Sequence, residues 1–151
     1  MRLGMPKRIL VATDFTDASK LALREAAAVA EGCNAELVVL YADALLPPAD
    51  VKAEVPDRFA DMSQSDKVAA AMKFLRKSVE EVIPPSVFVD PVVAADEPAA
   101  AILRTAQEKD ADWIVMATHG RTGVSRALRG SITEEVLRHA DRPVLAIHAT
   151  A

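Results

Sequence analysis

The chain's most informative segment for chemistry is residues 117–131, a stretch of small and basic residues. Gly120 lets the backbone turn tightly or approach a ligand closely. Gly130 and Ser131 are predicted to open a helix, whose free N–H groups and positive dipole end suit an anion. Three arginines lie between them, with no acidic residue, in a chain of net charge −4: Arg121, Arg126 and Arg129. The pattern favours a bound phosphate, and a solvated turn with helix caps is the alternative.

Other chemical signatures are missing from the sequence. There is no G-x-x-x-x-G-K-[ST] and no G-x-G-x-x-G, which argues against Walker-type and dinucleotide sites. Ser125 lacks the second glycine of a nucleophile elbow, and no histidine is spaced as part of a catalytic dyad. With no convincing general acid–base pair, the sequence does not predict a dedicated enzyme.

Composition excludes several further classes of protein. The single cysteine, Cys33, cannot form an intramolecular disulfide, and three histidines without a Cys pair lack zinc-site spacing. We therefore expect a reducing, cytoplasmic setting. No apolar run approaches the length of a membrane span, and residues 1–6 are too short for a secretory signal. An acidic chain with 4% aromatic residues argues against a nucleic-acid partner.

The elements that must position the loop alternate between strands and helices. Short apolar runs predict buried strands at 7–13, 35–42, 86–93, 112–117 and 143–148. Helices are expected at 18–31, 66–82, from Pro98 onward and from Gly130 to Ala140. Alternation in a 151-residue chain predicts one α/β domain, residues 1–151, with an open, mostly parallel sheet covered by helices on both faces. Such sheets bind ligands at the carboxyl ends of their strands, where Asp14 and the 117–131 loop lie.

Details at the element ends are also predicted. Thr16 and Asp17 are N-cap candidates for the first helix, with Gly32 as its left-handed C-terminal residue. Residues 45–65 contain three prolines without sustained periodicity, so a long surface connection is expected there. Pro91 cannot donate in a strand ladder, so it should lie at a strand end, a bulge or a sheet edge. Asp96 is expected to cap the helix that begins at Pro98.

Three segments together resemble the universal stress protein family across essentially the whole chain. The family's nucleotide-binding members carry Gly, two residues, Gly, nine residues, then Gly and Ser or Thr. Ala117 to Gly120, the nine residues 121–129, and Gly130-Ser131 follow this pattern, with Ala117 in place of the first glycine. Residues 9–16 resemble the family's first strand and acidic turn, and residues 142–147 resemble its last strand.

The resemblance implies a Rossmann-like fold of the adenine nucleotide alpha hydrolase type, with five parallel strands in the order 3-2-1-4-5. It implies ATP or AMP bound at the carboxyl edge, with Mg²⁺ or Mn²⁺ beside the phosphates, in a dimeric stress-response regulator. Its homodimer would form through the last strand, Pro143 to Ile147. An edge strand of this apolar composition would favour such pairing. Protein partners are unknown.

Site residues follow from the same resemblance, position by position. Ala12, Thr13 and Asp14 would lie beside the adenosine, and Ala42 would line the adenine pocket. Met116, Ala117 and Gly120 would flank the ribose and phosphates. Gly130, Ser131 and Ile132 would offer backbone N–H groups to the phosphates. The loop groups His119 and Arg121 would complete the binding set.

Two departures from the family pattern keep other functions open. Ala117 adds a methyl group beside the ribose–phosphate path, and Ala95-Asp96-Glu97-Pro98 lacks a glycine that the family commonly has before the proline. A dimeric interaction module with an empty nucleotide site is therefore one alternative. A slow ATP hydrolase is another, with only Asp14 and the loop arginines available to stabilise a transition state.

Overall fold

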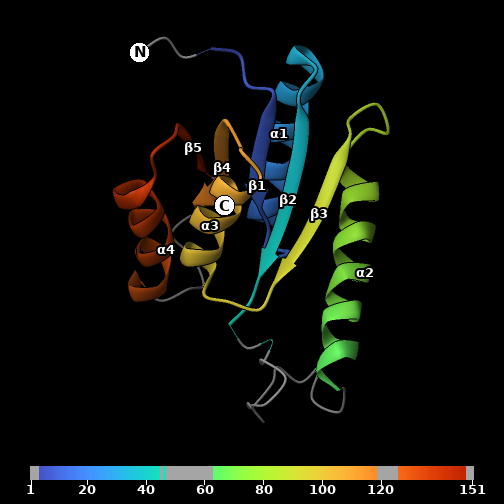
Figure 1. The fold of residues 1–151 in the computed structure, drawn as a ribbon, viewed down its shortest axis with the longest axis vertical. Coiled ribbons are helices and arrows are strands. Elements are labelled where there is room, and N and C mark those ends of the chain that lie inside the picture. Colours follow the sequence, from blue (N-terminus) through green and yellow to red (C-terminus); the bar gives the residue numbers. More distant parts are fainter. Residues whose placement is uncertain (1–3, 45, 47–62, 119–125, 149–151) are drawn as a thin grey trace.

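A computed structural model describes residues 4–44, 46, 63–118 and 126–148, with the backbone alone at 64 and 126–131. Its elements are β1 (Arg8–Ala12), α1 (Asp17–Cys33), β2 (Glu36–Ala42), α2 (Gln64–Val82), β3 (Val89–Ala94), α3 (Pro98–Glu108), β4 (Trp113–Thr118), α4 (Arg126–His139) and β5 (Val144–His148). Every strand pairing is parallel, in the order β3-β2-β1-β4-β5 (Figure 1). The predicted fold class and strand order are confirmed. Among the described helices, none is long and apolar enough to cross a membrane.

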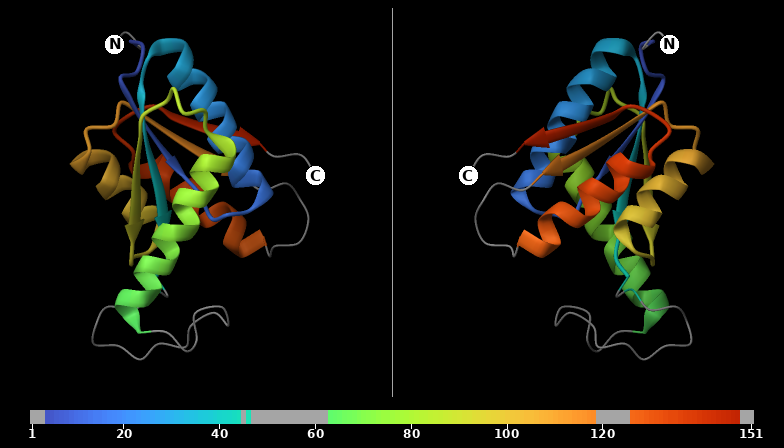
Figure 2. Two further views of the ribbon diagram at one scale, coloured as in Figure 1. Left: turned by 90° about the vertical axis from the view of Figure 1, so that its right-hand side faces the viewer. Right: turned by 90° about the vertical axis from the view of Figure 1, so that its left-hand side faces the viewer.

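Helices cover both faces of the sheet, as Figure 2 shows from two sides. Successive residues of a strand point to opposite faces, so β1 sends Val11 toward α1 and α2 and Leu10 toward α3 and α4. Both side chains are fully buried. A strand buried on both faces needs a continuous apolar run, which explains why β1 and β2 show no polar alternation.

Helix α1 begins where the sequence predicts and ends at Cys33, one residue beyond the expected glycine. Thr16 is the N-cap, and its side chain accepts a hydrogen bond from the Ser19 N–H. The predicted left-handed residue, Gly32, is instead helical, and Asn34 takes that conformation with φ 56°. Asparagine tolerates left-handed φ, and the Asn34 N–H bonds the Ala30 carbonyl to close the helix.

Helix α2 leads into β3, which is an edge strand of the sheet. Ser63 caps α2, which begins at Gln64 rather than at the expected Asp66. The predicted 45–65 connection lies mostly outside the described residues. β3 is an edge strand whose Pro91 pairs with Val39. This position confirms the edge placement predicted for Pro91, because an edge strand has one neighbour to satisfy.

Two helix starts differ from the sequence-based expectation. Glu97, rather than Asp96, is the N-cap of α3, and no side chain caps the helix. The Asp96 carboxylate bonds the adjacent Glu97 N–H and Arg104 instead. Helix α4 begins at Arg126, four residues before Gly130, because residues 126–129 are Arg, Ala, Leu and Arg, all good helix formers.

Arg142 precedes β5 and bonds to α3 and to the segment before β4, at the edge of the sheet where the strands begin. Its Nη1 donates to the Ala106 carbonyl of α3 at 2.8 Å and to the Ala111 carbonyl at 2.6 Å. The side chain is 17% exposed, so water replaces these bonds poorly. Its Nε also pairs with Asp141, and this hydrogen bond lowers the pKa of the Asp141 carboxyl.

Arg142→Ala should therefore lower the free energy of unfolding by about 2 kcal/mol, since two carbonyls lose a charged donor in a partly buried setting. Urea denaturation followed by circular dichroism measures the change. Arg24→Ala is the matched control, because Arg24 is exposed on α1 and should change stability by no more than about 0.5 kcal/mol. Equal effects of the two variants would contradict a special role for Arg142.

Candidate functional site

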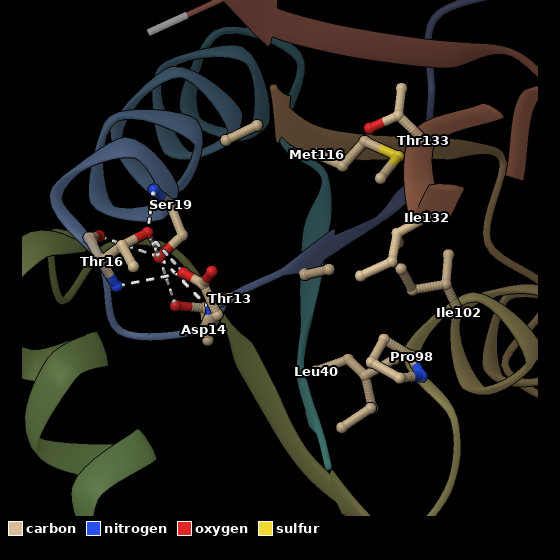
Figure 3. Close-up of a pocket in the computed structure, with 13 residues that line it drawn as sticks. Thr13, Asp14, Thr16, Ser19, Leu40, Pro98, Ile102, Met116, Ile132 and Thr133 are labelled. Atoms are coloured by element: carbon tan, nitrogen blue, oxygen red, sulfur yellow. Dashed lines mark hydrogen bonds between the residues drawn. The ribbon is translucent and has the colours of Figure 1, made fainter. Parts of the chain in front are cut away.

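A pocket opens at the carboxyl ends of β1, β2 and β4, with α3 and α4 on its other side (Figure 3). The cavity volume is about 300 Å³, at the lower end of the range of small-molecule sites. Its position follows from topology, since the strand order reverses between β1 and β4 and their connections leave toward opposite faces. The described lining residues are Ala12, Thr13, Asp14, Thr16, Ser19, Leu40, Ala42, Pro98, Ile102, Met116, Ala117, Ile132 and Thr133.

One side of the pocket is apolar. Leu40 comes from β2, Pro98 and Ile102 from the first turns of α3, Met116 from β4 and Ile132 from α4. Figure 3 shows these side chains together on one side of the space. Pro98 and Ile102 are four residues apart, so they lie on the same face of α3. This side offers a slot for a flat, weakly polar group.

The facing side is a cluster of hydroxyl groups around one carboxylate, built by the turn between β1 and α1 (Figure 3). The Thr13 and Ser19 hydroxyl oxygens lie 3.0 Å apart, and Ser19 Oγ donates to the Thr16 carbonyl at 2.9 Å. Thr16 donates its N–H to Asp14 Oδ1 at 3.0 Å, and its hydroxyl donates to the same oxygen. These bonds hold the Asp14 carboxylate in one orientation at the pocket.

Charge in the pocket comes from that carboxylate. Of the described lining residues, only Asp14 has an ionisable side chain. A carboxylate is an acceptor, so it suits a ligand that presents hydroxyl or amino donors, such as a sugar. No three His, Cys, Asp or Glu side chains come together as a metal site in the part of the chain that the structure describes.

A second carboxylate borders the site without lining it. Asp96 stands in the turn before Pro98. A hydrogen bond from Arg104, with a second from the Glu97 N–H, lowers the pKa of the Asp96 carboxyl. Arg104 also reaches Glu108, one turn further along α3, at 3.7 Å. This network fixes the turn that brings Pro98 to the pocket.

The structure brings together seven of the twelve residues expected at the binding site: Ala12, Thr13, Asp14, Ala42, Met116, Ala117 and Ile132. Gly130 and Ser131 lie in the second turn of α4 rather than at its start. The N–H groups without a helical partner therefore belong to the turn that begins at Arg126. His119, Gly120 and Arg121 lie outside the described residues.

Six lining residues were not singled out from the sequence as binding residues: Thr16, Ser19, Leu40, Pro98, Ile102 and Thr133. For two of these residues, Leu40 and Thr133, the sequence carried a signal that could have identified them. Leu40 precedes Ala42 by two residues on a predicted strand, so both must face the same side. Thr133 adjoins Ile132. The contribution of α3 depends on how that helix crosses the sheet, which local sequence does not specify.

The Asp96 interaction gives a testable pH dependence. Because the folded-state pKa is lowered, the interaction stabilises the protein above the pKa of the unfolded chain and is lost as the pH falls through the folded-state value. Arg104→Gln should raise the pKa of Asp96 toward 3.8, the ordinary value of an aspartate carboxyl. An NMR titration of the carboxyl carbon measures it, with Arg138→Gln as control. An unchanged Asp96 pKa in Arg104→Gln would contradict this origin of the shift.

Comparisons with known proteins agree with the geometry. The model of the universal stress protein family matches residues 5–148. Universal stress protein MJ0531 of Methanocaldococcus jannaschii is 32% identical over 141 residues, covering 93% of this chain and 81% of that protein.

Two solved structures have a similar fold. That of MJ0577, from the same organism, covers 98% of this chain and 99% of its own at 24% identity, with a TM-score of 0.75. A universal stress protein from Archaeoglobus fulgidus, solved in complex with dAMP, is 25% identical, with a TM-score of 0.58 and coverage of 97% of this chain and 99% of its own.

Proposed function

Because the chain belongs to the universal stress protein family, we propose that the pocket at the carboxyl edge of its sheet binds an adenine nucleotide, AMP or ATP. The observation that carries the proposal is the division of the pocket into an apolar slot and a facing carboxylate–hydroxyl cluster. A nucleoside has the same division, with a flat base joined to a hydroxyl-rich sugar. The A. fulgidus relative in complex with dAMP supports this ligand class.

The base fits the slot between Leu40, Ile102 and Met116. Aliphatic side chains pack well on the faces of an aromatic ring, and a methionine sulfur adds a favourable contact. Ala12 and Ala42 leave room there because their side chains are single methyl groups. The ribose then faces Asp14, whose carboxylate accepts hydrogen bonds from sugar hydroxyls.

The phosphates extend toward the segment between β4 and α4. This segment holds Gly120, Arg121 and His119, and its glycines and cations suit an anion. The first turn of α4 begins at Arg126 and adds free N–H groups, with Gly130 and Ser131 one turn further along. A Mg²⁺ or Mn²⁺ ion would be held chiefly by the phosphates, since the described residues form no metal cluster of their own.

The proposed activity is binding that regulates, not turnover. Among the described residues that line the pocket, Asp14 offers one titratable group, and acid–base hydrolysis needs a positioned pair or an activated water. Nucleotide occupancy would then change a surface that partners recognise during stress. Ala117, the departure from the family's glycine pattern, lines the pocket with one methyl group and leaves the cavity open.

Filling the slot tests the nucleotide proposal. Ala42→Phe should reduce AMP affinity at least about tenfold, measured by isothermal titration calorimetry, because the ring occupies the space of the base. Asp14→Asn should weaken binding less, by removing a charge-assisted acceptor for the ribose. Ala28→Phe is the matched control, since Ala28 is exposed on α1.

Two results would contradict the proposal. One is a wild-type protein that binds neither AMP nor ATP at a ligand concentration of about 1 mM. The other is equal affinity in wild type and Ala42→Phe. Nucleotide released when freshly purified protein is denatured, and identified by mass spectrometry, would independently support an occupied site.

We also propose that two copies pair through β5. This strand is at the sheet edge, with β4 as its neighbour in the described sheet, and Leu145 is 39% exposed on it. Leu137 of α4 adds an exposed apolar side chain at 53%. An apolar edge strand presents unpaired backbone donors and acceptors that a second copy can satisfy.

Leu145→Lys should shift the protein toward the monomer, because it places a charge within the proposed interface. Sedimentation velocity at about tens of micromolar protein measures the change, a concentration suited to modest interfaces. The control is Phe88→Lys, at an exposed residue beside the opposite edge strand. A wild-type protein that sediments as a monomer would contradict the dimer.

A further inference from the structure

The turn that carries Asp14 contains a residue in an unusual backbone conformation. Phe15 has φ 67°, in the left-handed region that non-glycine residues rarely adopt. Its neighbours Asp14 and Thr16 both line the pocket, and Phe15 does not. The Phe15 N–H donates to Thr13 Oγ1 at 3.1 Å, which ties the turn back to the end of β1. The positive φ lets the chain present Asp14 and Thr16 to the pocket while the side chain of Phe15, between them, points elsewhere.

The Phe15 ring packs on the face of the sheet that α1 and α2 cover. Its centroid lies 4.6 Å from that of Tyr41, at the end of β2, and 6.3 Å from that of Phe74 in α2. Both separations are within the range of favourable aromatic pairs. Tyr41 is only 5% exposed, and its hydroxyl donates to Asp43 Oδ2 at 2.9 Å, so it is held firmly. Phe74 is half exposed, at 49%.

A strained conformation persists only where surrounding contacts enforce it. Here the contacts are aromatic and come from two other elements, β2 and α2. Without the ring, residue 15 would relax toward an ordinary φ and rotate Asp14 and Thr16 relative to the slot. The hydroxyl bonds lie within the turn and the first turn of α1, and the Thr13 N–H donates to the Leu40 carbonyl of β2 at 2.9 Å. The Phe15 ring adds a side-chain anchor for the turn on β2 and α2.

We propose that Phe15 is a positioning residue for the nucleotide site, and that it orients Asp14 by anchoring its turn on Tyr41 and Phe74. The inference rests on the proposed function and extends it to a residue that does not touch the ligand. It also links the site to α2. Since coupling between two sites is reciprocal, nucleotide binding at Asp14 strengthens the packing of α2 on Phe15.

The test compares affinities for AMP by isothermal titration calorimetry. Phe15→Ala removes the ring and leaves a Cβ that disfavours the positive φ, so the turn should relax and binding should weaken about tenfold, while Phe74→Ala should weaken it about threefold. Phe15→Gly accepts the positive φ but also loses the ring, and should resemble Phe15→Ala. Phe15→Tyr keeps the ring and should restore affinity to within about twofold of wild type. Phe88→Ala, an exposed phenylalanine before β3, is the control and should bind as wild type.

A second measurement separates positioning from simple stability. Hydrogen exchange of residues 64–82 should slow when AMP binds the wild-type protein, and should not respond in Phe15→Ala at saturating ligand. If Phe15→Ala does not fold, Phe74→Ala decides by the same two readouts. Thermal destabilisation with unchanged AMP affinity in folded Phe15 and Phe74 variants would overturn the inference.

Nucleotide binding by the wild-type protein distinguishes failure of the proposed function from failure of the positioning role of Phe15. A wild-type protein that binds neither AMP nor ATP contradicts the proposed function, and this inference with it. A wild-type protein that binds AMP, with Phe15→Ala of equal affinity, contradicts the positioning role alone. Weaker binding in Phe15→Ala and Phe15→Gly, with recovery in Phe15→Tyr, supports it.

Discussion

The pocket depends on the point where the sheet's strand order reverses, between β1 and β4. Here α1 leaves β1 toward one face and α4 follows β4 toward the other. The two connections diverge, and none of the described helices covers the strand ends between them, so a cavity forms there. The other features of the site, its apolar slot and its hydroxyl cluster, are side chains that this edge brings within reach of each other.

The apolar and the polar side of the pocket come from different elements of the fold. Strands β2 and β4 and helices α3 and α4 supply the apolar wall, and the turn into α1 supplies the polar one. The polar turn is held from within by hydroxyl bonds and from outside by the Phe15 ring. Pocket geometry is therefore coupled to helices on both faces, which gives a ligand a physical route to alter the protein's surface.

Much of this arrangement could be predicted from the sequence. Buried strands, Pro91 at an edge and Asp14 at a strand end all follow from local patterns. The errors were at helix ends: residues 126–129 extend α4 because their propensity outweighs the pull of Gly130 toward a helix start, and Asn34 replaced Gly32 as the left-handed residue. Pro98 and Ile102 line the pocket because of how α3 crosses the sheet, and Phe15 shapes the neighbouring turn through its positive φ. Local sequence encodes neither the crossing of α3 nor the φ of Phe15.

Methyl NMR during titration with AMP tests directly whether the nucleotide binds in the space between the apolar slot and Asp14. If AMP binds there, saturable chemical-shift changes should appear in the methyl groups of the lining residues Leu40, Ile102, Met116 and Ile132. The methyl groups of Ile83, buried at the end of α2, should not move. Saturable shifts confined to methyl groups away from the pocket, or none at all, would contradict the account.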